Sequence, residues 1–300
     1  MSSSSAPATA KEDPGNTTAI WAQNSAKKLR VQAWPTIKYL TRTDVHTFAF
    51  SVAANAILSF FPFVVLLLTV SRKVFHSETM VDVIANLLRD YLPTGQEFIV
   101  RNLKALASAR KGAQVASLCI LLFTSTGVFL PLEVALNGVW GFTKNRSYLG
   151  NQIIALLLAF ASGVLAMISI ALTAGNQVLV GRVLGSNIVS DVIGFLVMKV
   201  FAIACSVSIF FLIYWILPNG RVTPKAVFPS AFVMGVILEV AKLVYVLTLP
   251  YLNFQEVYGP FAISVTLIFW AFLSGLMLLA GAHLSAIGAD NGHAVAANGH

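Results

Sequence analysis

Residues 192–217 read VIGFLVMKVFAIACSVSIFFLIYWIL, an apolar stretch whose only charged side chain is Lys199. The hydrocarbon core of a bilayer is about 30 Å thick, and a helix rising 1.5 Å per residue crosses it in about 20 residues. Because backbone amides find no water at that depth, a stretch of this length must be helical if it enters the membrane. The stretch therefore predicts a transmembrane helix.

Five further stretches share this length and apolar character. The complete set is 47–70, 114–135, 153–180, 192–217, 226–249 and 261–287. The chain is 57% hydrophobic and 11% charged, with a mean hydropathy of +0.79, which is too apolar for a soluble domain of 300 residues. The sequence predicts an all-α, polytopic membrane protein, a six-transmembrane-helix bundle with one membrane domain over residues 47–287.

The formal net charge of +8 is compatible with two kinds of partner, nucleic acid and anionic lipid. The basic residues lie mostly in short segments beside the apolar stretches, where lipid headgroups are the expected partner. Residues 25–46 are one such basic juxtamembrane segment, with amphipathic spacing that Pro35 interrupts. We therefore expect the lipid bilayer and anionic headgroups as partners, and no nucleic acid. The oligomeric state is left open.

The basic segment before the first span favours a cytoplasmic N-terminus, and six spans would return the C-terminus to the same side. The long connection 71–113 also carries basic residues, but long loops weigh less in this rule. The ends of the chain, residues 1–24 and 288–300, have no apolar periodicity, and both are expected to be disordered tails. The expected location is the bacterial inner membrane.

The connection 71–113 contains two helix signals. Val81, Ile84 and Leu88 recur at helical spacing, and Thr94-Gly-Gln-Glu97 has a capping-box pattern that predicts the start of a second helix. We expect two amphipathic surface helices between the first two spans. Two arrangements are compatible with them: the helices cover the outer mouth of the bundle, or they lie passively on the membrane.

Charged side chains inside the spans are the main candidates for function, because a charge at the bilayer centre costs at least about 2.5 kcal/mol. Counted from the turn at Pro218, Lys199 lies about 27 Å along its helix; counted from about Thr223, Glu239 lies about 24 Å along the next. The two are then level across an antiparallel hairpin. Lys242 shares the helix face of Glu239.

This placement predicts one carboxylate held between two ammonium groups, with a surplus positive charge that would suit an anion. The alternative is that Glu239 pairs with one lysine while the other extends to the headgroups along its aliphatic chain. Glu133 lies at a different depth, where it is expected to be a boundary residue or a partner of Lys144 or Arg146.

Prolines and an asparagine inside the spans are a second class of candidates. Pro62 and Pro131 each remove a backbone donor, so they predict kinks that free carbonyl groups. Asn55 is either a pathway residue or a hydrogen-bonding contact between helices. Pro218-Asn-Gly220 predicts a turn that makes the fourth and fifth spans antiparallel neighbours.

The sequence offers little for catalysis. The five histidines, at 46, 76, 283, 293 and 300, form no closely spaced metal-binding set. Neither a glycine-rich phosphate loop nor a nucleophile motif occurs. We therefore expect no metal, no cofactor and no enzymatic activity, and a hydrolytic metal site of the nuclease type is disfavoured.

Several sequence blocks together resemble one family. They are Leu58-Ser-Phe-Phe-Pro62, the run PLEVALNGVWG at 131–141, LPNGRV at 217–222, Val257-Tyr-Gly259 and Gly281-Ala-His283. Their order and spacing are similar to those of the YihY/BrkB family of bacterial inner-membrane proteins, long mislabelled as ribonuclease BN. The resemblance covers about residues 44–287.

The resemblance implies a six-span inner-membrane protein with cytoplasmic termini, associated with envelope integrity and serum resistance. It matches Glu239 to the family's fifth-span acid and Tyr258 with Gly259 to its Tyr-Gly turn. His283 stands where relatives tend to have glutamate, so any ion coupling would be altered or tuned by pH. The expected function is a transporter or lipid translocator for an anionic or envelope component; the alternative is a structural scaffold of the envelope without transport.

Overall fold

A computed structural model describes residues 34–92, 96–108, 111–143, 146–179, 188–252 and 254–297. The expected tail 1–24 and the first part of the juxtamembrane segment lie outside the described residues, as do residues 93–95 of the capping-box pattern. Every regular element in the described ranges is helical, which confirms the predicted all-α class.

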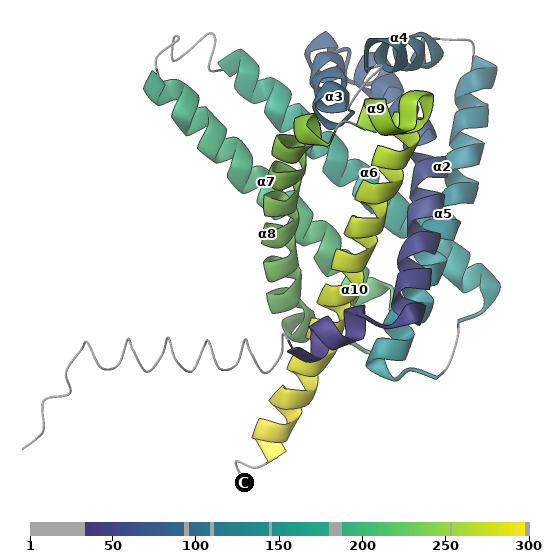
Figure 1. The fold of residues 1–300 in the computed structure, drawn as a ribbon, viewed down its shortest axis with the longest axis vertical. Helices are drawn as coiled ribbons and strands as arrows, with labels where there is room; N and C mark the ends of the chain where they lie inside the picture. The colour runs from purple at the N-terminus through teal and green to yellow at the C-terminus, as the bar shows by residue number, and fades with distance from the viewer. Residues whose placement is uncertain are drawn as a thin grey trace, which may run out of the picture.

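The long helices are α2 (Thr43–Lys73), α5 (Lys111–Trp140), α6 (Tyr148–Leu179), α7 (Ile188–Ile216), α8 (Pro224–Thr248) and α10 (Ala262–Ala297). The short elements are α3 (Glu78–Tyr91), α4 (Gln96–Ala107), α9 (Phe254–Tyr258) and the 3₁₀ turns η2 (Leu249–Tyr251) and η3 (Gly259–Phe261). Figure 1 shows α3, α4 and α9 at one end of the bundle, here called the α3/α4 end. The opposite end carries residues 34–42 and the connection 217–223.

Five helices in the described residues are long and apolar enough to span a membrane. They are Thr43–Lys73, Tyr148–Gly175, Gly194–Ile216, Pro224–Thr248 and Phe254–Gly288. The remaining expected span, 114–135, falls in α5, where Gly127–Trp140 qualifies as a shorter apolar helix. The polytopic architecture is confirmed, and the count of six spans stays a prediction.

The interior divides into two apolar clusters. One joins α2, α5, α7, α8 and α10 around the fully buried Tyr214, Leu136 and Leu279. The other, toward the α3/α4 end, packs Val81 of α3 and Leu103 of α4 with residues of α2 and α6. Because α3 and α4 contribute buried side chains to this second cluster, they cover the bundle rather than lie beside it.

Polar contacts cap α3 and join it to α4. The Ser77 hydroxyl accepts a hydrogen bond from the Met80 amide, 3.3 Å away, and so caps the start of α3. The Arg89 guanidinium pairs with the Glu97 carboxylate at 2.7 Å and holds the pKa of Glu97 below its usual value. The described side chain of Glu97 therefore links the two helices.

Helices α7 and α8 come into backbone contact at Gly235. A Cβ atom at this position would lie 2.9 Å from the Val207 Cα atom, a distance that real Cβ atoms essentially never show. A similar constraint acts at Gly281 of α10, where a Cβ would lie 2.1 Å from the Tyr214 hydroxyl oxygen. From the region of the α7–α8 contact, α7 leans away from α8 toward the α3/α4 end (Figure 1).

The C-terminal segment differs from the expected disordered tail at 288–300. Helix α10 continues to Ala297, ten residues beyond the predicted end of the last span at 287. Residues 289, 294, 296 and 297 are alanines, which have the highest helix propensity. Extending an existing helix also avoids the cost of nucleating a new one.

The close contact at Gly235 predicts that even one added methyl group destabilises the fold. We expect Gly235→Ala to lower the free energy of unfolding by about 1–3 kcal/mol, the usual cost of overpacking. Gly175→Ala is the matched control, because a Cβ there meets nothing within 4 Å. Detergent-solubilised protein unfolded with SDS and followed by circular dichroism gives both values; equal stability of the two variants would contradict the prediction.

Candidate functional site

A cavity of about 590 Å³ lies between α2, α3, α6, α7, α8 and α10, toward the α3/α4 end. We call it the charged cavity. Most of its walls are apolar, including Phe60, Phe63 and Trp270. Its lining also includes the polar or charged residues Ser169, Thr173, Lys199, Glu239 and Lys242, and the hydroxyl-bearing Tyr245. Three of the residues expected from the sequence to mark a pathway therefore line one space within the bundle.

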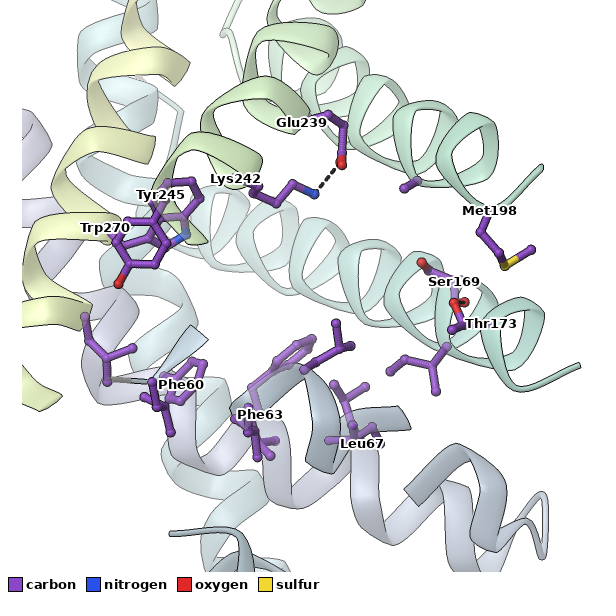
Figure 2. A pocket seen from close by; sticks show the side chains of 18 of the residues that line it. Phe60, Phe63, Leu67, Ser169, Thr173, Met198, Glu239, Lys242, Tyr245 and Trp270 are labelled. Atoms are coloured by element: carbon purple, nitrogen blue, oxygen red, sulfur yellow. Dashed lines mark hydrogen bonds and ion pairs between the residues drawn. The ribbon is translucent and has the colours of Figure 1, made fainter. Parts of the chain in front are cut away.

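Glu239 is the buried acid of this cavity, with 7% of its surface exposed. Its Oε1 atom accepts a hydrogen bond of 2.6 Å from the Ser206 hydroxyl of α7. The same oxygen forms an ion pair with the Lys242 ammonium one helical turn further along α8, drawn as a dashed line in Figure 2. A buried carboxylate needs such partners, because an unpaired buried charge is strongly destabilising.

The expected three-residue cluster is wrong in its placement of Lys199, which does not contact Glu239. The α7 residue that contacts Glu239 is Ser206, and Lys199 lies seven positions earlier, or about 10 Å along the helix. In the described part of the chain Lys199 forms no ion pair; its ammonium lies 5.8 Å from the centroid of the Phe195 ring. The depths of Lys199 and Glu239 were counted from the turn as if α7 and α8 were parallel neighbours along their whole length. In the structure α7 and α8 cross at Gly235, so residues at equal distance from the turn are not necessarily in contact.

The side chains of the charged cavity still carry a surplus positive charge. Lys199 and Lys242 contribute two formal positive charges and Glu239 one negative charge, so the sum is +1. Figure 2 shows Glu239 and Lys242 on one wall, with Ser169 and Thr173 on the α6 wall. The arrangement can hold one anionic group against apolar and aromatic surfaces.

A second polar cluster lies at the opposite end of the bundle and centres on Arg146. Its guanidinium donates hydrogen bonds to the carbonyl oxygens of Ile216, Leu217 and Pro218 at 3.1, 3.2 and 2.7 Å. The last carbonyls of a helix have no partner within it, so Arg146 satisfies the end of α7 from the connection between α5 and α6. The turn at Pro218 joins α7 to α8, as predicted.

Glu133 belongs to this second cluster. It is buried, with 3% of its surface exposed, and its carboxyl group is in hydrogen-bonding contact with the Asn219 side chain. The backbone N–H of Asn219 donates to Asn137 Oδ1 at 2.8 Å. Of the two partners expected for Glu133, Arg146 lies near enough to act on it electrostatically, and Lys144 lies outside the described residues. Glu133 is therefore separate from the charged cavity.

Gly220 is required in the turn by close packing. A Cβ atom there would lie 2.2 Å from the ring of Phe142, which itself stacks on Trp140 with ring centroids 6.4 Å apart. The turn thus lies directly against the end of the segment 131–141.

His283 binds the juxtamembrane segment and does not line the charged cavity. Its ring stacks on Tyr39 with centroids 4.4 Å apart, and its Nδ1 atom lies 3.0 Å from the Thr36 hydroxyl oxygen. These contacts fasten the helical residues 34–40 to α10. Burial raises the pKa of Tyr39 to about 12, so this ring stays neutral at physiological pH.

The other sequence candidates lie outside the charged cavity. The Asn55 amide donates to the Ser51 carbonyl of its own helix at 2.9 Å, and a Cβ at Gly127 of α5 would collide with the Asn55 side chain. Pro62 and Pro131 lie inside helices that continue through them, so the expected kinks stay predictions. Gly259 adopts a positive φ of 52°, as a tight turn requires.

Long apolar helices around a charged interior cavity define a multi-pass integral membrane protein. The profile of the Virulence factor BrkB family matches residues 36–299, and the chain belongs to this family. The resemblance seen in the sequence blocks is confirmed.

Similar curated proteins carry the name UPF0761 membrane protein. The one from Pseudoalteromonas atlantica is 22% identical over 253 residues, 83% of each chain. The one from Chromohalobacter salexigens is 25% identical over 212 residues, 67% of this chain and 49% of the relative, so this match spans about half of the relative's length. The one from Aeromonas salmonicida is 24% identical over 200 residues, 66% and 67% of the two chains. No solved structure matches the chain.

The ion pair between Glu239 and Lys242 predicts a characteristic pattern in a double-mutant cycle. Lys242→Met leaves the Glu239 charge buried without its cation, and we expect a loss of about 3 kcal/mol in the free energy of unfolding. Adding Glu239→Gln removes the orphaned charge and should recover part of that loss. Lys199→Met is the control, because Lys199 forms no ion pair with the described residues; strictly additive losses would contradict the coupling.

The Arg146 contacts predict local opening at the turn. Arg146→Lys keeps the charge but loses the planar fork that reaches several carbonyls. We expect amide hydrogen exchange in residues 217–222 to become about tenfold faster, equivalent to about 1.4 kcal/mol. Mass spectrometry resolves this segment, and Arg221→Lys at an exposed position is the control. Unchanged exchange in Arg146→Lys would show that the three contacts do not hold the turn.

Proposed function

We propose that this protein is a transporter or lipid translocator that moves an anionic or lipidic envelope component across the bacterial inner membrane. The observation that supports the proposal is the charged cavity, which places two lysines and one buried glutamate among long apolar helices. Ionisable groups in such helices are expensive and are typically found on substrate or ion pathways. The proposal assigns no metal, cofactor or reaction to the cavity.

The proposal also includes an orientation. The basic residues before α2 favour a cytoplasmic position for residues 34–42, and the connection 217–223 lies at the same end. With the C-terminal end of α10 on that side, both termini are cytoplasmic. The α3/α4 end then faces outward, and the charged cavity lies in the outer half of the membrane domain.

One observation favours the alternative of a structural envelope protein without transport. The Glu239 carboxylate is already bound by Ser206 and Lys242, and these contacts join α7 to α8. A satisfied buried pair of this kind could serve only to fix helix packing. The transporter and the structural protein differ in whether the protein moves any lipid or solute across the membrane.

A measurement of lipid movement in liposomes distinguishes the transporter from the structural protein. Purified protein is reconstituted with fluorescent anionic or zwitterionic lipids, and dithionite quenching reports their movement between leaflets. We expect anionic lipid flux in the wild type and at least about a tenfold loss in a folded Glu239→Gln variant, because the buried charge that holds Lys242 in the cavity is removed. Glu78→Gln, at an exposed position outside the cavity, is the control for loss of a carboxylate elsewhere in the chain.

Absence of flux above protein-free liposomes for both lipids would overturn lipid translocation. Undiminished flux in a folded Glu239→Gln variant would overturn the role of the charged cavity. A stability loss in Glu239→Gln without any flux in the wild type is the result that the scaffold function predicts.

A further inference from the structure

A second cavity lies beside the charged one. It has a volume of about 670 Å³, lies between α2, α5 and α6, and is open on one side, where lining residues such as Phe160 are exposed. Its walls are almost entirely apolar, with Phe129 of α5 and Phe160 and Met167 of α6 among them. We call it the apolar cavity.

The two cavities share one thin wall. Phe60, Phe63 and Leu67 line both of them. These three residues lie on one face of α2, three and four positions apart. The backbones of α2 and α6 approach each other at few positions, and side chains of both helices fill the space between them. The side chains of these three residues therefore form part of the boundary between the two cavities.

We propose that the two cavities are one binding site for a phospholipid with a singly charged anionic headgroup. The headgroup phosphate binds Lys199 and Lys242 in the charged cavity, and an acyl chain occupies the apolar cavity across the Phe60, Phe63 and Leu67 wall. The biological meaning of the site rests on the proposed function, but the binding itself does not depend on transport.

Charge complementarity selects the headgroup. The carboxylate of Glu239 is bound by Ser206 and Lys242, whereas the ammonium of Lys199 has only the Phe195 ring as a recorded contact in the described residues. One negative charge therefore neutralises the surplus of +1. A zwitterionic headgroup would bring a further cation beside two lysines, where like charges repel at low dielectric.

The lining of the apolar cavity favours an acyl chain as its occupant. A space with so few polar groups does not hold ordered water, which needs two to four polar partners. An acyl chain gains about 0.8 kcal/mol for each methylene group that it buries, so it is the favoured occupant. A free phosphate ion would use the lysines but leave this cavity without an occupant.

Gly163 of α6 provides a way to block the chain without touching the lysines. It lines the apolar cavity, and a Cβ there would lie 3.7 Å from the Phe63 ring, an ordinary contact. A leucine side chain at this position extends into the space that the chain would occupy. Ser162→Leu in the same cavity is a second blocking variant, for use if Gly163→Leu does not fold.

The test compares dioleoyl phosphatidylglycerol with dioleoyl phosphatidylcholine, which have the same chains. Native mass spectrometry of the full chain measures how much of each lipid stays bound. We expect the wild type to prefer phosphatidylglycerol by about tenfold, and Lys199→Gln to lose that preference while Lys199→Arg keeps it. Gly163→Leu should weaken both lipids by at least about fivefold and leave their ratio unchanged. Lys225→Gln, at the exposed start of α8, is the control and should resemble the wild type.

Each failure has a separate meaning. An unchanged lipid preference in folded Lys199→Gln would overturn the headgroup site, and unchanged retention in a folded blocking variant would overturn the chain site. Preferential binding of phosphatidylglycerol without flux in liposomes would overturn transport but not this site. Flux that depends on Glu239 without any lipid preference in binding would overturn this site and leave transport standing.

Discussion

The contact between Gly235 and Val207 sets how α7 and α8 meet beside the charged cavity, and these two helices carry all of its charged side chains. Two helices reach backbone contact only where a side chain is missing, and Gly235 supplies that gap on α8. The crossing places Ser206 beside Glu239, and beyond it α7 leans away from α8. The space left by this divergence is lined by residues of six helices, with Lys199 on the α7 side. The cavity is therefore a consequence of one close approach followed by a separation.

The helical architecture could be predicted from the sequence because the bilayer leaves few alternatives. Apolar length fixes which stretches become long helices, and the turn residues at Pro218 fix which ones are antiparallel neighbours. The charged residues Glu239 and Lys242 could be paired because they are on one helix face. All of these inferences use only local spacing or the thickness of the membrane.

The remaining features depend on contacts between distant segments. Counting residues from a turn gives depth along each helix but not the crossing angle, so Lys199 was placed beside Glu239 and Ser206 was missed. A small polar residue within an apolar span was the only local signal for Ser206. In the same way, the blocks 131–141 and 217–222 were recognisable separately, but nothing in their sequence shows that Asn137 binds the Asn219 amide.

The Arg146 contacts make the bundle asymmetric in how it can move. They tie the connection between α5 and α6 to the end of α7, so the hairpins α5–α6 and α7–α8 are fastened together at one end. A rotation of one hairpin about this joint would displace its atoms in proportion to their distance from the joint. Helix α7 has 29 residues and is about 44 Å long, so a rotation of about 5° moves its far end by about 4 Å. In the same rotation Lys199, which lines the charged cavity about 26 Å from this end of α7, moves by about 2 Å.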